Sequence, residues 1–197
     1  MKHIFFFFVN LVLFTFSAKC QLDKKHWLVG GSGNLYFYND DFTTIGQPTV
    51  SGKLTEINLS GNVGYFFIDK FAVGLRPGIK SLKSRGLNTA SAGHKEVALY
   101  IGPFARYYFL NSERPFNILL DGSYQIGSYS TFIGKGSFKK ATIMAGPEIF
   151  FNTSVGMEIM VGYMHQSMSI TEEQPGINHK KSGVYLSIGF QLHLIKD

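Results

Sequence analysis

The chain has 197 residues, of which 45% are hydrophobic and 15% aromatic, with a single cysteine and a formal net charge of +6. This length fits one domain, and a single cysteine excludes an internal disulfide. A basic chain can bind nucleic acid, but the sequence contains no basic helix or basic stripe, so we expect no nucleic-acid partner.

The first 20 residues have the features of a secretory signal peptide. After a basic start, the run Ile4–Phe16 is almost wholly apolar. This run is too short to span a bilayer as a helix but suits a cleaved signal. Cleavage after Cys20 would leave Gln21 as the new N-terminus. The alternative is a lipoprotein anchored through Cys20, although Lys19 stands where such a site prefers a small residue.

Residues 21–197 contain eight stretches in which apolar and polar residues alternate. They are Trp27–Tyr38, Glu56–Phe67, Phe71–Lys80, Glu96–Leu110, Phe116–Tyr129, Phe138–Phe151, Val155–Gln166 and Gly183–Leu194. The connectors after the second, fourth and sixth stretches are brief, and the other connectors are longer and polar. Tight turns at one end and longer loops at the other are the layout of a bacterial outer-membrane barrel. The sequence therefore predicts an all-β fold, an eight-stranded antiparallel up-and-down transmembrane β-barrel.

Side-chain alternation predicts which residues face outward and which face the lumen. The outward set is apolar, whereas a soluble ligand-binding barrel would have the opposite sense. The charges predicted to face inward are Glu56, Arg76, Lys80, Glu96, Arg106, Asp121, Glu148 and Glu158. Because an eight-stranded lumen is filled by side chains, these charges must pair. We expect Arg76 and Arg106 to bind inward carboxylates, and the candidates are Asp121, Glu148 and Glu158.

Outward aromatic residues gather beside the three short connectors. They are Trp27, Tyr65, Phe67, Phe71, Tyr107, Phe109, Phe116 and Phe151. A thinner set, Phe37, Tyr124 and Tyr163, lies toward the other rim. Aromatic rings prefer the headgroup level of a membrane. We therefore expect the short turns and both termini to be periplasmic and the long loops to lie outside the cell.

Three prolines lie inside the predicted strands, at Pro77, Pro103 and Pro147, and each has a glycine beside it. A proline removes one donor from the hydrogen-bond ladder, and a closed barrel has no open edge where it could be placed. We expect a β-bulge or a local bend at each proline.

Three segments resemble the strands and hairpins of the small outer-membrane β-barrel family of Gram-negative bacteria, the OmpX/OmpW-like barrels. They are Gly64–Leu75, Ile101–Phe109 and Ile188–Leu194. The resemblance implies an eight-stranded barrel without an assigned activity. It also implies recognition by the barrel-assembly machinery through a terminal aromatic residue. Here the chain continues to Asp197, and Phe190 or Leu194 is the candidate for that role.

His165 and Ser167 lie at the end of the seventh stretch, and Glu172 and Glu173 follow shortly after. Alternation places His165 and Ser167 on the outward face, where a histidine could activate a serine and a carboxylate could orient the histidine. The arrangement resembles the His-x-Ser motif of the lipid A deacylase family, although the sequence departs from that family directly after the serine. A lipid A deacylase-like esterase that uses these four residues is therefore an alternative.

Basic residues recur in three of the predicted long loops. They are Lys83, Arg85, Lys95, Lys139, Lys140, Lys180 and Lys181. Lysine and arginine are the natural ligands of phosphate. One interpretation is ordinary solubilising charge. The other is contact with the phosphates of lipopolysaccharide, which with outer-membrane lipid would then be a partner of the barrel.

The predicted function is that of a monomeric integral outer-membrane barrel with a structural or surface-interaction role and no catalysis. The histidines are dispersed and no glycine-rich phosphate loop opens a helix, so we expect no metal and no cofactor. The alternatives are the membrane esterase and a soluble periplasmic ligand-binding barrel.

Overall fold

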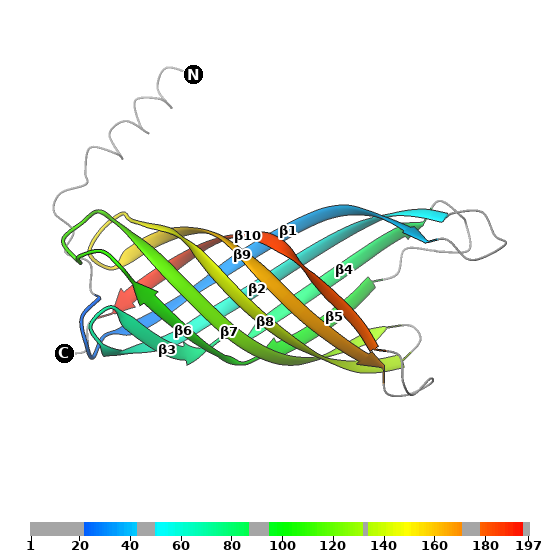
Figure 1. The fold of residues 1–197 in the computed structure, drawn as a ribbon, viewed down its shortest axis with the longest axis horizontal. Coiled ribbons are helices and arrows are strands. Elements are labelled where there is room, and N and C mark those ends of the chain that lie inside the picture. The colour runs from blue at the N-terminus through cyan, green and yellow to red at the C-terminus, as the bar shows by residue number, and fades with distance from the viewer. Residues whose placement is uncertain (1–21, 43–49, 87–94, 132–133, 171–177, 195–197) are drawn as a thin grey trace, which may run out of the picture.

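A computed structural model describes residues 22–42, 50–86, 95–131, 134–170 and 178–194, which form one antiparallel sheet closed into a barrel (Figure 1). The predicted signal peptide with Cys20 lies outside the described residues, as do Glu172 and Glu173. Among the described residues, no helix is long and apolar enough to cross a membrane.

The sheet is built from ten strand segments. They are β1 (Trp27–Phe42), β2 (Val50–Ile68), β3 (Phe71–Leu75), β4 (Gly78–Gly86), β5 (Lys95–Ile101), β6 (Pro103–Tyr108), β7 (Phe116–Thr131), β8 (Gly134–Phe150), β9 (Val155–Ile170) and β10 (Asn178–Leu194). Most strands continue further than the stretches predicted from the sequence. The ladders persist after the apolar alternation has stopped, so part of each predicted long loop belongs to a strand.

The ten segments make eight strands around the ring, as predicted. β3 and β4 form one strand interrupted at Arg76 and Pro77, and β5 and β6 form the next strand, interrupted at Gly102. At the interruption the Arg76 backbone N–H donates to the Gly102 carbonyl at 2.8 Å. The ring order is β1, β10, β9, β8, β7, then β5 with β6, β4 with β3, and β2, which pairs again with β1.

A bulge or a local bend was predicted at each of the three prolines, and the bulge is not observed. The pairs on the two sides of Pro77, Pro103 and Pro147 keep the same register. The register shift found in the described ladders lies instead between Phe66 and Ile68, beside a short turn. Each proline removes one donor from the wall, and the wall accommodates that missing rung without an inserted residue.

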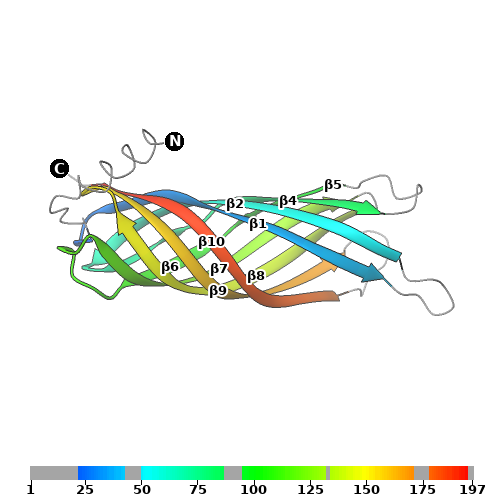
Figure 2. The same cartoon turned by 90° about the horizontal axis from the view of Figure 1, so that it is seen from above.

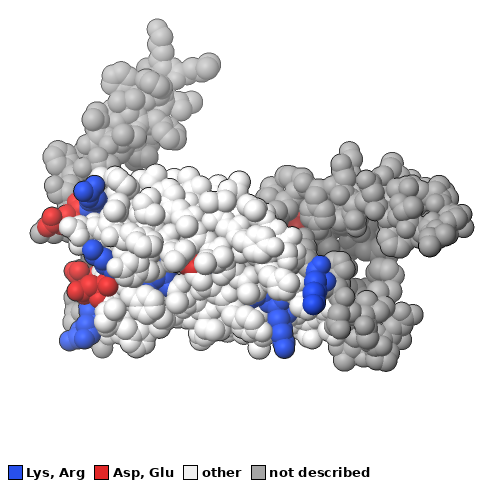
Figure 3. Space-filling model, viewed as in Figure 1, with Lys and Arg blue, Asp and Glu red and all other residues white. Residues whose placement is uncertain are grey.

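Side-chain alternation follows the prediction along the described strands. On β10 the outward Val184 is 74% exposed, whereas the inward Ser187 and Gln191 are buried. On β5 and β6 the outward Leu99 is exposed and the inward Phe104 is buried. The space-filling view shows the result, a mostly uncharged wall with charged side chains toward its two ends (Figure 3).

The two ends of the barrel differ in their connections. The short-turn end carries the turns after β2, β6 and β8 together with both ends of the described chain, Leu22 and Leu194 (Figures 1 and 2). The opposite end, where β1 stops at Phe42 and β10 starts at Asn178, is called the long-loop end below.

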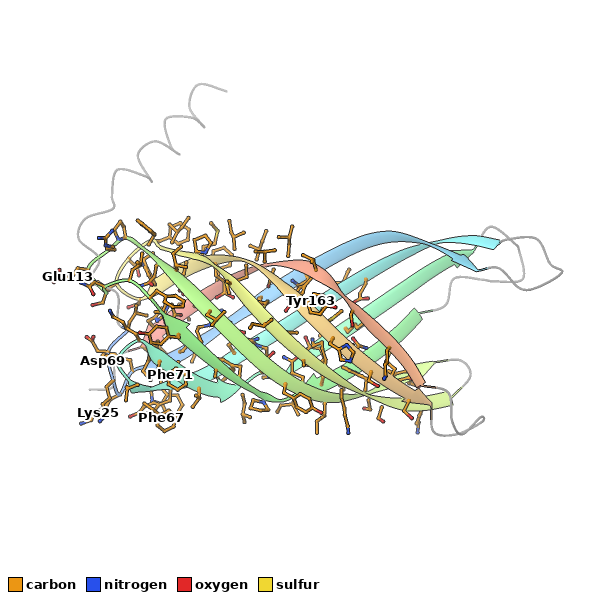
Figure 4. The ribbon with its side chains drawn as sticks, viewed as in Figure 1. Lys25, Phe67, Asp69, Phe71, Glu113 and Tyr163 are labelled. Carbon is orange, nitrogen blue, oxygen red and sulfur yellow. The ribbon has the colours of Figure 1, made fainter. Side chains whose placement is uncertain are left out.

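Apolar side chains fill the lumen from the short-turn end toward the middle of the barrel. The cluster contains Leu22, Leu28, Phe66, Ala72, Phe104, Tyr108, Leu119, Met144, Phe150 and Met160. Leu22 precedes β1 and is held in place because its carbonyl accepts the Lys70 backbone N–H at 2.7 Å. The Lys24 backbone N–H also donates to Asp69 Oδ1 at 2.7 Å. Figure 4 labels Lys25 and Asp69 at this end.

The ring closes by a short ladder between β1 and β10, which we call the seam. The ladder runs from the Trp27–Leu194 pair to the Gly33–Ile188 pair, whereas β1 pairs with β2 as far as Phe42. Beyond this ladder β1 and β10 diverge toward the long-loop end (Figure 1). At the point of divergence the Asn34 side-chain amide donates to the Leu186 carbonyl.

Candidate functional site

Two arginines and two carboxylates form an ionic chain across the middle of the lumen. Arg76 binds Asp121 through both terminal nitrogens, at 2.8 and 2.7 Å, and Arg106 Nε donates to the same carboxylate at 3.0 Å. Arg106 Nη1 also donates to Glu158 across the lumen at 2.7 Å. All four residues are at most 4% exposed. The predicted pairing of both arginines with inward carboxylates is therefore confirmed.

Glu148, the third predicted carboxylate, has other partners. His193 Nε2 lies 2.8 Å from its Oε1, and the Tyr108 hydroxyl donates to its Oε2 at 2.9 Å. The Phe66 and Phe150 rings pack against the imidazole, with centroids 6.0 and 5.4 Å away. This group ties β6, β8 and β10 together beside the apolar cluster of the short-turn end.

The lumen becomes polar toward the long-loop end. Lys140 is buried there, and its Nζ lies 4.0 Å from the centroid of the Tyr100 ring, which is a cation–π contact. Lys80 Nζ lies 3.3 Å from Glu56 Oε2. The prediction that Lys140 belongs to the outer basic rim is therefore wrong. It occupies an even position on β8, as Glu148 does, and this parity turns its side chain inward.

A cavity of about 10 Å³ lies between these polar side chains. Its lining includes Ser32, Asn58, Tyr100, Lys140 and Tyr185. A volume of this size accommodates roughly one water molecule. Among the described residues, this cavity is too small to hold a substrate beside the buried carboxylates.

Guanidinium groups engage both carboxylates of the ionic chain. Both Asp121 oxygens accept hydrogen bonds from Arg76, and Glu158 Oε2 accepts one from Arg106. Within the described residues, no three His, Cys, Asp or Glu side chains are placed to hold a metal ion. The arrangement can cross-link strands from opposite sides of the barrel.

The residues of the alternative catalytic site lie on the outer wall of β9. His165 is exposed, and its Nδ1 lies 2.7 Å from the hydroxyl oxygen of Ser182, its cross-strand partner on β10. Ser167 is partly buried on the same face of β9. Glu172 and Glu173 lie outside the described residues. The described hydrogen bond of His165 is thus with Ser182.

Two lysines of the predicted basic rim are exposed on the same part of the wall. Lys139 lies on β8 and Lys180 on β10, and both pair in register with Ser167 on the strand between them. These lysines therefore belong to strands rather than to loops. The side chains of Lys83, Arg85, Lys95, Glu96, Lys181 and Phe37 lie outside the described part of the structure.

Sequence reasoning missed two interior residues, although the signal for both was present. Alternation had already turned Glu148 inward, and the same parity along β8 includes Lys140. His193 has the same parity along β10 as the inward Ser187 and Gln191, but this parity does not predict its pairing with Glu148. That pairing depends on how β8 and β10 face each other across the lumen. Alternation along a single strand does not predict which residues of two strands lie opposite each other.

The chain matches no protein-family model and no curated protein sequence. Its structure is similar to that of the outer membrane protein OprG from Pseudomonas aeruginosa, with a TM-score of 0.52 and 14% sequence identity over 90% of this chain and 99% of that one. Neisserial surface protein A aligns with a TM-score of 0.44 and 16% identity over 85% of this chain and 96% of that one. The N-terminal β-barrel domain of Pseudomonas aeruginosa OprF aligns with a TM-score of 0.46 and 14% identity over 87% and 98%. The closed ring of eight strands and the similarity to OprG show that the chain has the fold of the eight-stranded outer-membrane β-barrels.

Proposed function

We propose that this chain is an integral barrel of the outer membrane of a Gram-negative bacterium, with a structural or surface-interaction role and no open pore. The observation that carries the proposal is the apolar band of the wall. From Val184 to Leu194 every outward residue of β10 is apolar and at least 41% exposed. At about 3.3 Å per residue and a tilt of about 40°, this run is about 25 Å tall, which matches the apolar band of outer-membrane barrels.

Aromatic residues bound this band and support the proposal. Toward the short-turn end, the rings of Trp27 and Tyr65 contact each other with centroids 5.2 Å apart, and those of Tyr107 and Phe109 with centroids 5.1 Å apart. Toward the long-loop end the exposed aromatic residues include Tyr163, labelled in Figure 4. Rings at both limits fit the two headgroup levels of a bilayer.

The polarity of the barrel argues against a soluble ligand-binding barrel. Such a barrel needs an apolar interior for its ligand and a polar exterior for water. Here the interior holds the ionic chain, and the exterior presents exposed apolar residues on every strand of the described wall. A soluble monomer rarely exposes a continuous apolar patch larger than about 600 Å².

Membrane fractionation tests the proposed placement. The expressed full chain should stay with the outer-membrane fraction after alkaline carbonate washing and should dissolve only in detergent. Unboiled samples should migrate faster than boiled samples, because a closed barrel resists detergent unfolding at room temperature. Release by carbonate would contradict the proposal.

We further propose that the barrel is a monomer of the OmpX/OmpW-like type, inserted by the barrel-assembly machinery, with outer-membrane lipid and lipopolysaccharide as its surroundings. The short turns and both termini then face the periplasm. A cysteine introduced at Gly46, between β1 and β2, or at Thr171, between β9 and β10, should react with an impermeant maleimide on intact cells. A cysteine at Ser112, in a short turn, should not react until the cells are opened. The reverse pattern would invert the proposed topology.

A lipid esterase is the second candidate function, favoured by the 2.7 Å contact of His165 with Ser182. A histidine in this position could activate either neighbouring serine, Ser182 or the predicted Ser167. The test is release of fatty acid from lipid A by the purified barrel in detergent. Release that is lost in His165→Ala and in one of the two serine variants would support the candidate, and absence of release would remove it.

A further inference from the structure

We infer that a polar patch on the outer wall of β8, β9 and β10 binds the phosphate group of a membrane lipid headgroup. The phosphate patch consists of Lys139, His165, Ser167, Lys180 and Ser182. The inference rests on the proposed membrane placement, because it assigns a specific lipid contact to one part of the wall.

Strand register brings the two lysines to opposite sides of one small residue. Lys139 on β8 and Lys180 on β10 both pair with Ser167 on β9. Neighbouring strands are about 4.8 Å apart, so the two lysine backbones are separated by about 10 Å. Because Ser167 is short, both ammonium groups can turn over it toward one anion. Lysine ammonium groups and a serine hydroxyl are all suitable donors to phosphate oxygens.

The next row of the same ladder adds a further donor. His165 pairs with Ala141 on one side and Ser182 on the other, and its Nδ1 is engaged by the Ser182 hydroxyl. When that hydroxyl donates to Nδ1, the ring proton resides on Nε2, which makes the second nitrogen a donor. Ala141 is small and leaves the row open between the imidazole and Lys139.

The patch begins where the apolar band ends. Along β9 the outward residues Ile159, Val161 and Tyr163 are exposed and precede His165. Tyrosine is the side chain expected at headgroup level, so the residues directly beyond Tyr163 meet the phosphates of the adjacent leaflet. Blue side chains stand out from the white wall toward this end in Figure 3.

The seam provides additional donors beside the patch. β10 pairs with β9 from Asn178 onward, but its described pairs with β1 begin only at Ile188. The backbone edge between these points therefore faces the space into which β1 and β10 diverge. Backbone N–H groups at the edge of a bilayer need acceptors, and headgroup oxygens next to Lys180 can supply them.

Lipid binding to the folded, detergent-solubilised full chain tests the inference. The probes are lipid A, lipid A from which the phosphates have been removed, and inorganic phosphate, with retained lipid measured by native mass spectrometry. We expect the intact lipid to bind and the dephosphorylated lipid to bind about tenfold more weakly, as for two partly exposed ion pairs. Lys139→Gln with Lys180→Gln should weaken lipid A binding by about the same factor, and the arginine pair at these positions should restore it.

Lys24→Gln with Lys25→Gln is the matched control, because it removes the same charge from exposed positions at the short-turn end. This control should bind lipid A as the wild type does. The inference is wrong if the Lys139 and Lys180 glutamine pair binds normally, or if inorganic phosphate displaces the lipid as effectively as lipid A itself. Both results would leave the proposed function intact, since that proposal fails only if the wild-type chain is not recovered from membranes as a heat-modifiable barrel.

Discussion

The two ends of this barrel are closed by different interactions. At the short-turn end the lumen contains an apolar cluster around Leu28 and Tyr108, and the ladders on either side of β1 are both present. At the long-loop end the lumen is polar around Lys140, and β1 and β10 separate beyond Gly33. The first end resembles the core of a soluble protein, whereas the second depends on individual hydrogen bonds and cation contacts. Stability should therefore decrease along the barrel from the short turns to the long loops.

The ionic chain between the two ends should give the largest effect. Arg106→Leu leaves Asp121 and Glu158 buried with one partner fewer each, and we expect a loss of about 3–5 kcal/mol in the free energy of unfolding. A urea titration of refolding in detergent measures it. Tyr107→Leu, at the neighbouring outward position, is the control and should change stability little. A wild-type midpoint for Arg106→Leu would mean that the guanidinium is solvated.

Truncation in the apolar cluster should come next. Leu28 is fully buried at the short-turn end, and Leu28→Ala should cost about 2–4 kcal/mol, because a cavity remains after a large-to-small change in a core. The same titration applies, with Val29→Ala on the outward face as the control. Equal effects of the two substitutions would show that this end is not packed more tightly inside than outside.

The seam should be less sensitive. Asn34→Ala removes the side-chain bond to the Leu186 carbonyl, and we expect a loss of about 1 kcal/mol, the usual net value of one hydrogen bond. Hydrogen exchange should become faster in the neighbouring Gly33–Ile188 rung. Asn111→Ala, which loses an exposed bond from Lys70, should leave both measurements unchanged. No change in exchange for Asn34→Ala would mean that the backbone alone holds this rung.

A substitution in the polar part of the lumen should change the free energy of unfolding the least. Lys140→Met replaces a buried ammonium by an apolar side chain of similar length and loses the contact with Tyr100. Removing the buried charge stabilises the barrel, whereas losing the cation–π contact destabilises it. We therefore expect the free energy of unfolding to change by less than about 1 kcal/mol in either direction. The variant is measured beside Arg106→Leu in the same titration. A loss as large as that of Arg106→Leu would show that Lys140 is part of an ionic network as tight as the central one.

Most of the predictions that the structure confirms came from the alternation of apolar and polar side chains along the strands. It placed Arg106, Asp121 and Glu158 inside the barrel, and period-two alternation needs no knowledge of neighbouring strands. It did not say which carboxylate each arginine would bind. That choice depends on the stagger between strands, which brings Arg106 of β6 opposite Glu158 of β9.

The ends of the strands were harder to predict for a related reason. Lys180 was assigned to a loop because the predicted alternation begins only at Gly183, and Lys139 was assigned to the basic rim although it lies at the edge of the predicted stretch Phe138–Phe151. Hydrogen-bonded ladders continue past the point where the wall becomes polar. For the prolines the prediction allowed a bulge or a local bend, and the register excludes the bulge. A missing donor at Pro147 can be tolerated without a bulge, and sequence alone does not distinguish these two accommodations.

The seam has a consequence for the order of folding. It joins the two extremes of the chain, Trp27 to Leu194, so it carries the largest loop-closure entropy of any ladder in the ring. Yet it stops at Gly33, whereas β1 pairs with β2 as far as Phe42. Non-local pairings of this kind form slowly. Hairpins such as β9 with β10 can therefore assemble first, and closing the ring is the step at which an unfinished barrel would wait longest with two strand edges open.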